Sequence, residues 1–254
     1  MLEKIIRQQL EEREILLMTH LVIGYPSFEE NAKTIKAMVE ANVELIELQI
    51  PFSEPTADGP VILKANSASL EAGTTVEACM MFAKSMCKTY PDVSFLFMTY
   101  YNIVFVYGEE RFRADAKLIG VRGLIIPDLP PEEGKQWYKE CRGESIDSIL
   151  IFTPTHTQKR LHQLAEDAMG FVYCVGRRGV TGNKTAFDET LAGQIETYRE
   201  ATRLPLALGF GVQEKSDIDF LKQQVEIAVI GSKLIQIQNE SGTDAIKDFL
   251  VSIR

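Results

Sequence analysis

Short apolar runs alternate with amphipathic segments along almost the whole chain. Eight of these runs are nearly continuous in apolar residues, which is typical of parallel strands that are covered on both faces. They lie at 16–24, 44–51, 93–101, 123–129, 148–155, 170–176, 204–211 and 227–234. A segment with helical periodicity follows each run. The pattern therefore predicts eight strand–helix units.

The segments between the runs predict helices. Ser27 and Glu30 form a capping-box pattern at the start of a helix that extends to Ala41. Apolar positions at residues 2, 5, 6 and 10 form one stripe of a short N-terminal helix. The stretch 93–108 contains no charged residue and is predicted as a strand that continues into a loop. Other helices are expected near 61–72, 76–88, 109–118, 132–141, 158–168, 191–201 and 216–224, with more at the end of the chain.

Eight strand–helix units in 254 residues match the number and size expected of a (β/α)8 TIM barrel. No break in composition and no proline- or serine-rich linker divides the chain, so we expect one domain over residues 1–254. An open, doubly wound sheet is the alternative. In a (β/α)8 barrel the active-site groups lie at the C-terminal ends of the strands and in the loops that follow. This rule selects the candidate functional residues.

Composition narrows the class of partner. The net charge of −9 and the pI near 5.0 argue against nucleic acid and anionic membranes as main partners. The four cysteines and three histidines follow no metal-ligand spacing, so we expect no metal site and reduced thiols. The N-terminus lacks the apolar centre of a signal peptide, and no stretch is apolar for long enough to cross a membrane. We therefore expect a cytoplasmic protein.

Two carboxylates stand out in the stretch IELQIPFSEPTADGP. Glu47 lies in the second apolar run, on the face opposite Ile46 and Leu48, and should point into the barrel near its mouth. A buried carboxyl group suits a general acid or base, although a structural ion pair at the other end of the barrel is the alternative. Asp58 follows in a loop stiffened by three prolines, which would hold it beside Glu47, but it is also a common turn residue.

Glycines close the seventh and eighth runs, at Gly209-Phe210-Gly211 and at Gly231-Ser232. Barrels often bind phosphate with the loops after these two strands and with the N-terminus of a helix. The combination predicts a phosphate site, and the alternative is a pair of simple turns.

Several further positions stay open between a pocket and a core role. The loop at 176–187 has three glycines and is a candidate lid, in which Thr181 and Gly182 could touch the substrate. Tyr173, in the sixth run, either reaches the pocket or packs in the core. His20, in the first run, likewise either faces the pocket or packs in the core.

Six blocks resemble, in order, those of the tryptophan synthase alpha subunit family. They are ELIELQIPFSEPTADGP, FMTYYNIVFVYG, GLIIPDLPPEE, GRRGVTG, LALGFGV and VIGSKLI, and the resemblance runs from about residue 24 to residue 235. It implies a (β/α)8 lyase that cleaves indole-3-glycerol phosphate to indole and glyceraldehyde 3-phosphate by a retro-aldol step. It also implies an α2β2 complex for L-tryptophan synthesis, in which the beta subunit carries pyridoxal phosphate and the alpha chain carries no cofactor.

The resemblance also assigns roles to residues. Glu47 matches the catalytic glutamate that moves the protons, and Asp58 matches the catalytic aspartate that binds the indole N–H. The phosphate and pocket positions of the family are matched by Tyr173, Thr181, Gly182, Phe210, Gly211, Gly231 and Ser232.

Three positions depart from the family pattern. Gln49 replaces a glycine and His20 a phenylalanine, and together they would make the indole pocket bulkier and more polar. Met98 is a further candidate pocket residue. Glu54 replaces an aspartate in the loop that would face the beta subunit. The departures keep two alternatives open: a catalytically weakened regulatory partner, and another phosphate-binding barrel enzyme acting on a related sugar phosphate.

Overall fold

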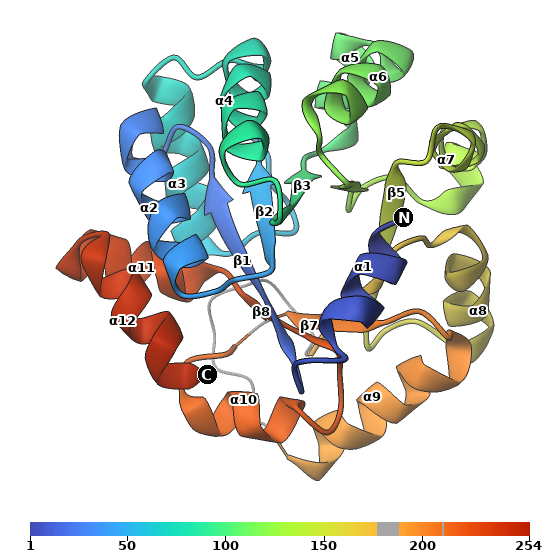
Figure 1. Ribbon diagram of the computed structural model, residues 1–254. Helices are drawn as coiled ribbons and strands as arrows, with labels where there is room; N and C mark the ends of the chain where they lie inside the picture. The colour runs from blue at the N-terminus through green and yellow to red at the C-terminus, as the bar shows by residue number, and fades with distance from the viewer. Residues whose placement is uncertain (177–187, 210) are drawn as a thin grey trace.

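Eight parallel strands close into a barrel in the computed structural model, which describes residues 1–176, 188–209 and 211–254. Each strand pairs with the next along the chain, and β1 also pairs with β8 (Figure 1). The strands are β1 Leu16–Val22, β2 Leu45–Gln49, β3 Ser94–Met98, β4 Gly123–Ile125, β5 Asp147–Phe152, β6 Val172–Val175, β7 Leu206–Gly209 and β8 Ile227–Ile230. Closure confirms the (β/α)8 barrel and excludes the open sheet.

Helices surround this barrel on its outer side (Figure 1). Their bounds are α1 Leu2–Gln9, α2 Phe28–Glu40, α3 Pro60–Glu71, α4 Val76–Thr89, α5 Tyr101–Tyr107, α6 Glu109–Ile119, α7 Pro131–Glu144, α8 Gln158–Asp167, α9 Glu189–Ala201, α10 Lys215–Leu221, α11 Ser232–Ser241 and α12 Asp244–Ile253. The expected cap of α2 is present, since the Ser27 hydroxyl accepts a hydrogen bond from the Glu30 N–H at 3.1 Å.

The prediction for residues 101–107 was wrong, because this part of the expected loop is the helix α5. Its aromatic and β-branched residues favour a strand by intrinsic propensity. Tertiary contacts override that preference: the N–H of Tyr101 at the start of α5 donates to Asp128 at 2.8 Å. Gly108, with φ of 95°, then ends α5 and lets α6 begin directly.

The strands divide their side chains between two cores. Ile46, Leu48 and Ile50 lie in the larger core between the barrel and the helices. Leu45, from the same strand, packs inside the barrel with Leu96 and Val229. Because side chains alternate along a strand, Glu47 takes the inner side together with Leu45, as the sequence predicts.

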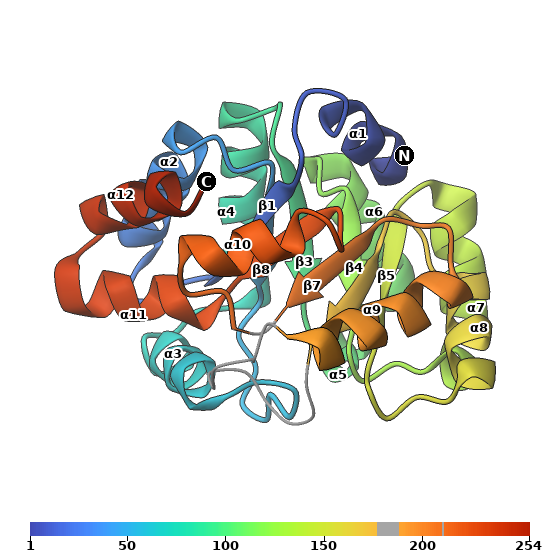
Figure 2. The ribbon, with the colours of Figure 1, turned by 90° about the horizontal axis from the view of Figure 1, so that it is seen from below.

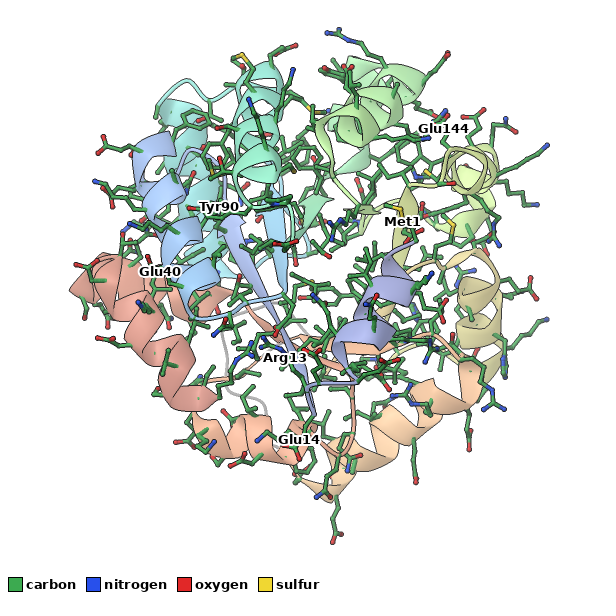
Figure 3. The ribbon with its side chains drawn as sticks, in the orientation of Figure 1. Met1, Arg13, Glu14, Glu40, Tyr90 and Glu144 are labelled. Carbon is green, nitrogen blue, oxygen red and sulfur yellow. The ribbon has the colours of Figure 1, made fainter. Side chains whose placement is uncertain are left out.

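The helix α1 covers one end of the barrel, and the loop between β2 and α3 lies at the opposite end (Figure 2). Leu2 and Ile6 of α1 are fully buried in the core inside the barrel. The N–H of Leu2 donates to Asp147, at the start of β5, at 2.6 Å. Arg13, labelled in Figure 3, pairs with the buried carboxylate of Glu44 at 2.5 Å. This end is closed by packing and ion pairs, which leaves the other end for a site.

No helix in the described part of the chain is long and apolar enough to cross a membrane.

Candidate active site

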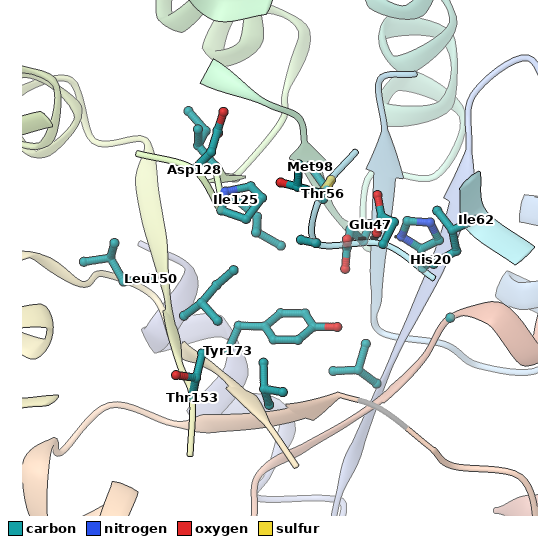
Figure 4. Close-up of a pocket in the computed structure, with 18 of the residues that line it drawn as sticks. His20, Glu47, Thr56, Ile62, Met98, Ile125, Asp128, Leu150, Thr153 and Tyr173 are labelled. Atoms are coloured by element: carbon teal, nitrogen blue, oxygen red, sulfur yellow. Dashed lines mark hydrogen bonds and ion pairs between the residues drawn. The ribbon is translucent and has the colours of Figure 1, made fainter. Parts of the chain in front are cut away.

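A cavity of about 540 Å³ opens at the C-terminal ends of the strands. Its wall is built from β1, β2, β3, β4, β5, β6 and β8 and from the loops that follow them (Figure 4). Glu47, Asp58, Tyr173 and Gly231 all belong to this wall, although they come from distant parts of the sequence. The barrel therefore brings the main candidate residues to one place.

Glu47 is buried beside His20 on the neighbouring strand, and both residues line the cavity. The strands β1 and β2 pair with His20 opposite Glu47. This register places the Nδ1 atom of His20 3.1 Å from the Oε1 atom of Glu47. The other carboxylate oxygen, Oε2, has no hydrogen-bond partner among the described residues. Glu47 therefore has one anchored oxygen and one buried oxygen that no described residue binds.

Among the described residues, two hydrogen bonds hold the Asp58 side chain. Its Oδ2 atom accepts from the Gln49 side-chain amide at 2.7 Å and from the Tyr100 hydroxyl at 3.2 Å. The same Tyr100 hydroxyl accepts from the Ala57 N–H at 3.0 Å, and the Tyr100 ring stacks on Phe52 with centroids 5.1 Å apart. The loop between β2 and α3 is thus fixed to the barrel by Tyr100.

Burial changes the acid–base properties of these groups. Burial raises the pKa of Asp58 above its ordinary value, although His20 and Gln49 act in the opposite direction. For His20, burial alone lowers the pKa, but the charge and hydrogen bond of Glu47 outweigh it, so the pKa of His20 is raised. Burial also raises the pKa of Tyr173, which stays a neutral hydroxyl. Burial and neighbouring charges thus shift the pKa values of three groups at this site, as is common where side chains carry out proton transfer.

Tyr173 extends from β6 across the cavity, with its hydroxyl toward the side where Glu47 and His20 lie (Figure 4). Its position depends on Gly209 of the neighbouring strand β7. A Cβ atom on Gly209 would come within 2.5 Å of the Tyr173 hydroxyl and 2.6 Å of its ring. Only glycine therefore leaves room for this tyrosine, which explains one glycine of the seventh run.

Another part of the cavity wall is built from glycines and a helix start. Gly211, Gly231 and Ser232 line it, and α11 begins at Ser232. Free N–H groups and the dipole at the start of this ten-residue helix favour an anion there. Gly211 has φ of 114°, a conformation that glycine adopts without strain. Thr181, Gly182 and Phe210, the other predicted phosphate contacts, lie outside the described residues.

Only some of the candidate pocket residues line the cavity. His20 and Met98 line the cavity, whereas Gln49 does not and is instead fully buried against Asp58. The expectation that Gln49 makes the pocket more polar is therefore wrong, because Gln49 does not line the cavity. Its side chain instead donates a hydrogen bond to Asp58. Glu54 is exposed on the loop between β2 and α3.

Two residues at the site escaped the sequence analysis. Tyr100 follows Met98 by two positions and shares its face, and this alternation is the signal that could have revealed it. Lys233 also lines the cavity, one residue after Ser232 at the start of α11, and its ammonium nitrogen lies over the Phe249 ring of α12, 5.9 Å from the ring centroid. A lysine in the first turn of a helix carries no sequence signal of its own.

The described ranges contain no group of three or more His, Cys, Asp and Glu side chains that could hold a metal ion. The groups at this cavity are proton donors and acceptors, together with glycines and a helix start that favour an anion. They suit acid–base cleavage of a phosphorylated substrate.

Comparison with known sequences agrees with this geometry. The family model for the tryptophan synthase alpha chain matches residues 6–250. The tryptophan synthase alpha chain of Desulfotalea psychrophila is 51% identical over 253 residues, which cover 100% of this chain and 99% of the relative. That of Desulforapulum autotrophicum is 49% identical and covers 100% of both chains.

Solved structures show the same similarity. A structure of Mycobacterium tuberculosis tryptophan synthase superposes with a TM-score of 0.91 at 27% identity, covering 99% of this chain and 96% of that one. A chain of the Pyrococcus furiosus tryptophan synthase complex superposes with a TM-score of 0.85 at 27% identity, covering 94% and 97%.

Proposed function

Because the chain belongs to the tryptophan synthase alpha chain family, we propose that its cavity cleaves indole-3-glycerol phosphate to indole and glyceraldehyde 3-phosphate. One observation carries the proposal at the level of residues. Glu47 and Asp58 line one part of a cavity, and Gly231 and Ser232, at a helix start, line another part. A substrate with an indole at one end and a phosphate at the other fits this division.

Glu47 is the residue that we assign to the reacting carbon. Its Oε2 atom has no partner in the described part of the chain and belongs to a cavity-lining side chain. It would protonate the C3 atom of the indole ring. The hydroxyl on the adjacent glycerol carbon then loses its proton, the carbon–carbon bond breaks, and its electron pair returns to the ring. No metal is needed for this retro-aldol cleavage.

Asp58 is the residue that we assign to the indole N–H. Protonation at C3 gives the ring a positive charge, which a nearby carboxylate stabilises. Two hydrogen bonds, from Gln49 and Tyr100, hold this carboxylate in one orientation. A fixed acceptor loses little energy to reorganisation during the reaction.

The anion site would orient the substrate. We assign the phosphate to the backbone of Gly211 and Gly231 and to Ser232, with Lys233 nearby. By the family pattern, Thr181, Gly182 and the Phe210 backbone complete the site. Tyr173 would pack between the two ends of the substrate.

The family also points to a partner. Another solved structure, of the Pyrococcus furiosus α2β2 complex, concerns its mutual activation. We propose that this chain, as one domain over residues 1–254, pairs with a beta subunit in the cytoplasm and passes indole to it. The exposed Glu54 would face that subunit. The pyridoxal phosphate belongs to the beta subunit and not to this chain.

The test is to measure indole release from indole-3-glycerol phosphate, with and without the beta subunit, for the wild type and Glu47→Gln. We expect low activity of the chain alone, activation by the partner, and a loss of at least about 100-fold in kcat in the variant. The Glu54→Asp variant, outside the cavity, should keep the activity of the chain alone. Full activity of Glu47→Gln would disprove the assignment of this residue.

A further inference from the structure

Three buried polar atoms of the site have no hydrogen-bond partner in the described ranges: Oε2 of Glu47, Nε2 of His20 and Oε1 of Gln49. The side chains of Glu47 and His20 bond to each other through their other atoms, at 3.1 Å. Both residues are only 4% exposed, and both line the cavity. A buried polar atom without a partner is costly, so such atoms call for an explanation. Here Glu47 has one carboxylate oxygen, and His20 one ring nitrogen, that no described residue binds.

His20 also lies where the middle of the substrate should be. On one side, β1 pairs with β2, with His20 opposite Glu47. On the other side, β1 pairs with β8, and a Cβ atom on Gly231 would lie 3.8 Å from the Cβ atom of His20. His20 therefore stands between the proposed proton donor and the proposed phosphate site. The glycerol carbons of the substrate would have to pass it.

We propose that His20 is a further catalytic residue, which takes the hydroxyl proton of the substrate at Nε2 while Glu47 gives its proton to the indole ring. This inference rests on the proposed function and deepens it. The reaction needs one proton given and one taken, and the pair has one free atom for each. A histidine whose Nδ1–H is held by a carboxylate is a known arrangement for a general base.

The protons and electrons balance. The reacting form of the pair has one exchangeable proton, on Oε2 of Glu47, and a neutral imidazole, and it is a tautomer of the form in which His20 holds that proton. The O–H bond of Glu47 breaks as the C3–H bond of the indole forms. The hydroxyl O–H bond then breaks as the Nε2–H bond forms, and the carbon–carbon electron pair returns to the ring. The pair ends with one proton, on His20, which returns to Glu47 through solvent once the products leave.

The surroundings of His20 favour this one-proton state. Among the described residues, the titratable groups beside His20 are Glu47 of β2 and Asp58 of the following loop. Tyr173 of β6 lies across the cavity from His20 (Figure 4). Lys233 lines the same cavity from α11. Burial disfavours the imidazolium, but Glu47 and then Asp58 outweigh it and raise the pKa of His20. The pair loses its proton as the pH rises through that pKa, so the rate should fall there.

The activity test uses three variants. His20→Asn keeps an N–H that can reach Glu47 but removes Nε2, whereas His20→Phe removes both nitrogens and keeps a ring. His162→Asn is the matched control, because His162 is exposed on α8. We expect both His20 variants to lower kcat by at least about 100-fold, to lose the alkaline limb of the pH profile, and to leave KM within about threefold. The control should match the wild type.

Each other outcome overturns the proposal. Near-normal kcat in His20→Asn with a loss in His20→Phe would show that His20 only orients Glu47. Near-normal kcat in His20→Phe would show that His20 only fills space. Thermal unfolding of every variant establishes that the rates are compared between folded proteins.

A second measurement does not depend on activity. The chain has three histidines, so the ring nitrogens of the ¹⁵N-labelled protein give few NMR signals, and the one lost in His20→Asn belongs to His20. We expect it to titrate above the ordinary value of 6.5, and its pKa to fall in Glu47→Gln. A pKa that Glu47→Gln leaves unchanged would overturn the pairing. If the wild type releases no indole, the proposed function fails, and the titration still reports on the pair.

Discussion

At the scale of single residues, the two carboxyls that we propose as catalytic differ in how they are held. Glu47 has one anchor, His20, and keeps a free oxygen. Asp58 has two anchors, and both bind the same oxygen. Different surroundings push two acids toward different roles. The one-anchor carboxyl suits proton transfer, and the doubly held one suits a fixed negative charge.

Gln49 gains a defined role from this contrast. Its side chain points along the barrel wall to Asp58 and leaves the cavity to His20 and Met98. The hydrogen bond from Gln49 favours the ionised form of Asp58 and so works against the effect of burial on its pKa. The position that departs most clearly from the family pattern thus supports a catalytic acid and does not block the pocket.

The buried charge of Asp58 should have a cost in stability. Its pKa is raised in the folded protein by burial, so the folded state binds more protons than the unfolded state above the ordinary value of 3.8. Stability therefore falls as the pH rises through this window. We expect Asp58→Asn to increase the free energy of unfolding at pH 7, and the gain to disappear as the pH falls toward 4.

Urea unfolding of Asp58→Asn and the wild type at pH 7 and near pH 4 checks this prediction, and Asp92→Asn, on an exposed turn before β3, is the control. A variant that is less stable than the wild type at pH 7 would show that the hydrogen bonds of Asp58 matter more than its burial.

At the scale of elements, the neighbouring strands β6 and β7 fit each other through one glycine. Gly209 leaves space for Tyr173, which is how a strand that forms the barrel wall also shapes the cavity. The helix α5 shows the same dependence on neighbours, because its sequence prefers a strand while Asp128 binds its first N–H. In both cases a contact between elements, not a local preference, sets the local structure.

Gly209→Ala should therefore disturb both packing and activity. The added methyl group would meet the Tyr173 ring at 2.6 Å and push it from its place. We expect a loss of about 1–3 kcal/mol in the free energy of unfolding, which is typical of an overpacked site. We also expect a fall in kcat/KM, since Tyr173 lines the cavity.

Gly193→Ala is the control for this change. Gly193 lies within α9, and its added Cβ atom would meet nothing within 4 Å. There the same substitution should stabilise the protein by about 0.5–1 kcal/mol, because alanine favours a helix interior over glycine. Denaturant unfolding and indole release measure both variants. Equal stabilities of the two variants would contradict the close contact at Tyr173.

At the scale of the whole molecule, the barrel separates stability from chemistry. The end covered by α1 holds a buried apolar cluster and the ion pairs of Glu44 with Arg13 and Arg254. The opposite end holds the cavity and its partnerless polar atoms. Such a division lets loops at one end carry unfavourable groups while the other end compensates.

A substitution at the α1 end should change stability alone. Ile6 is fully buried inside the barrel core, so Ile6→Ala should cost about 2–5 kcal/mol in the free energy of unfolding. Its kcat/KM, measured well below the unfolding temperature, should stay at the wild-type value. Lys4→Ala, on the exposed side of α1, should change stability by less than about 0.5 kcal/mol. A large loss of kcat/KM in folded Ile6→Ala would show that the two ends are coupled.

Much of this protein was readable from its sequence, because strand and helix periodicities are local. The eight apolar runs, the helix at Ser27, the inward face of Glu47 and the glycines before α11 all follow from residues within one turn or strand of each other. The contacts that shape the site, by contrast, join residues from different elements of the barrel. His20 meets Glu47 through strand register, Gln49 meets Asp58 through a loop, and Tyr173 needs a glycine 36 positions away. Only the closed barrel decides these contacts, because it sets which distant side chains share one small space and which of their polar atoms stay without partners.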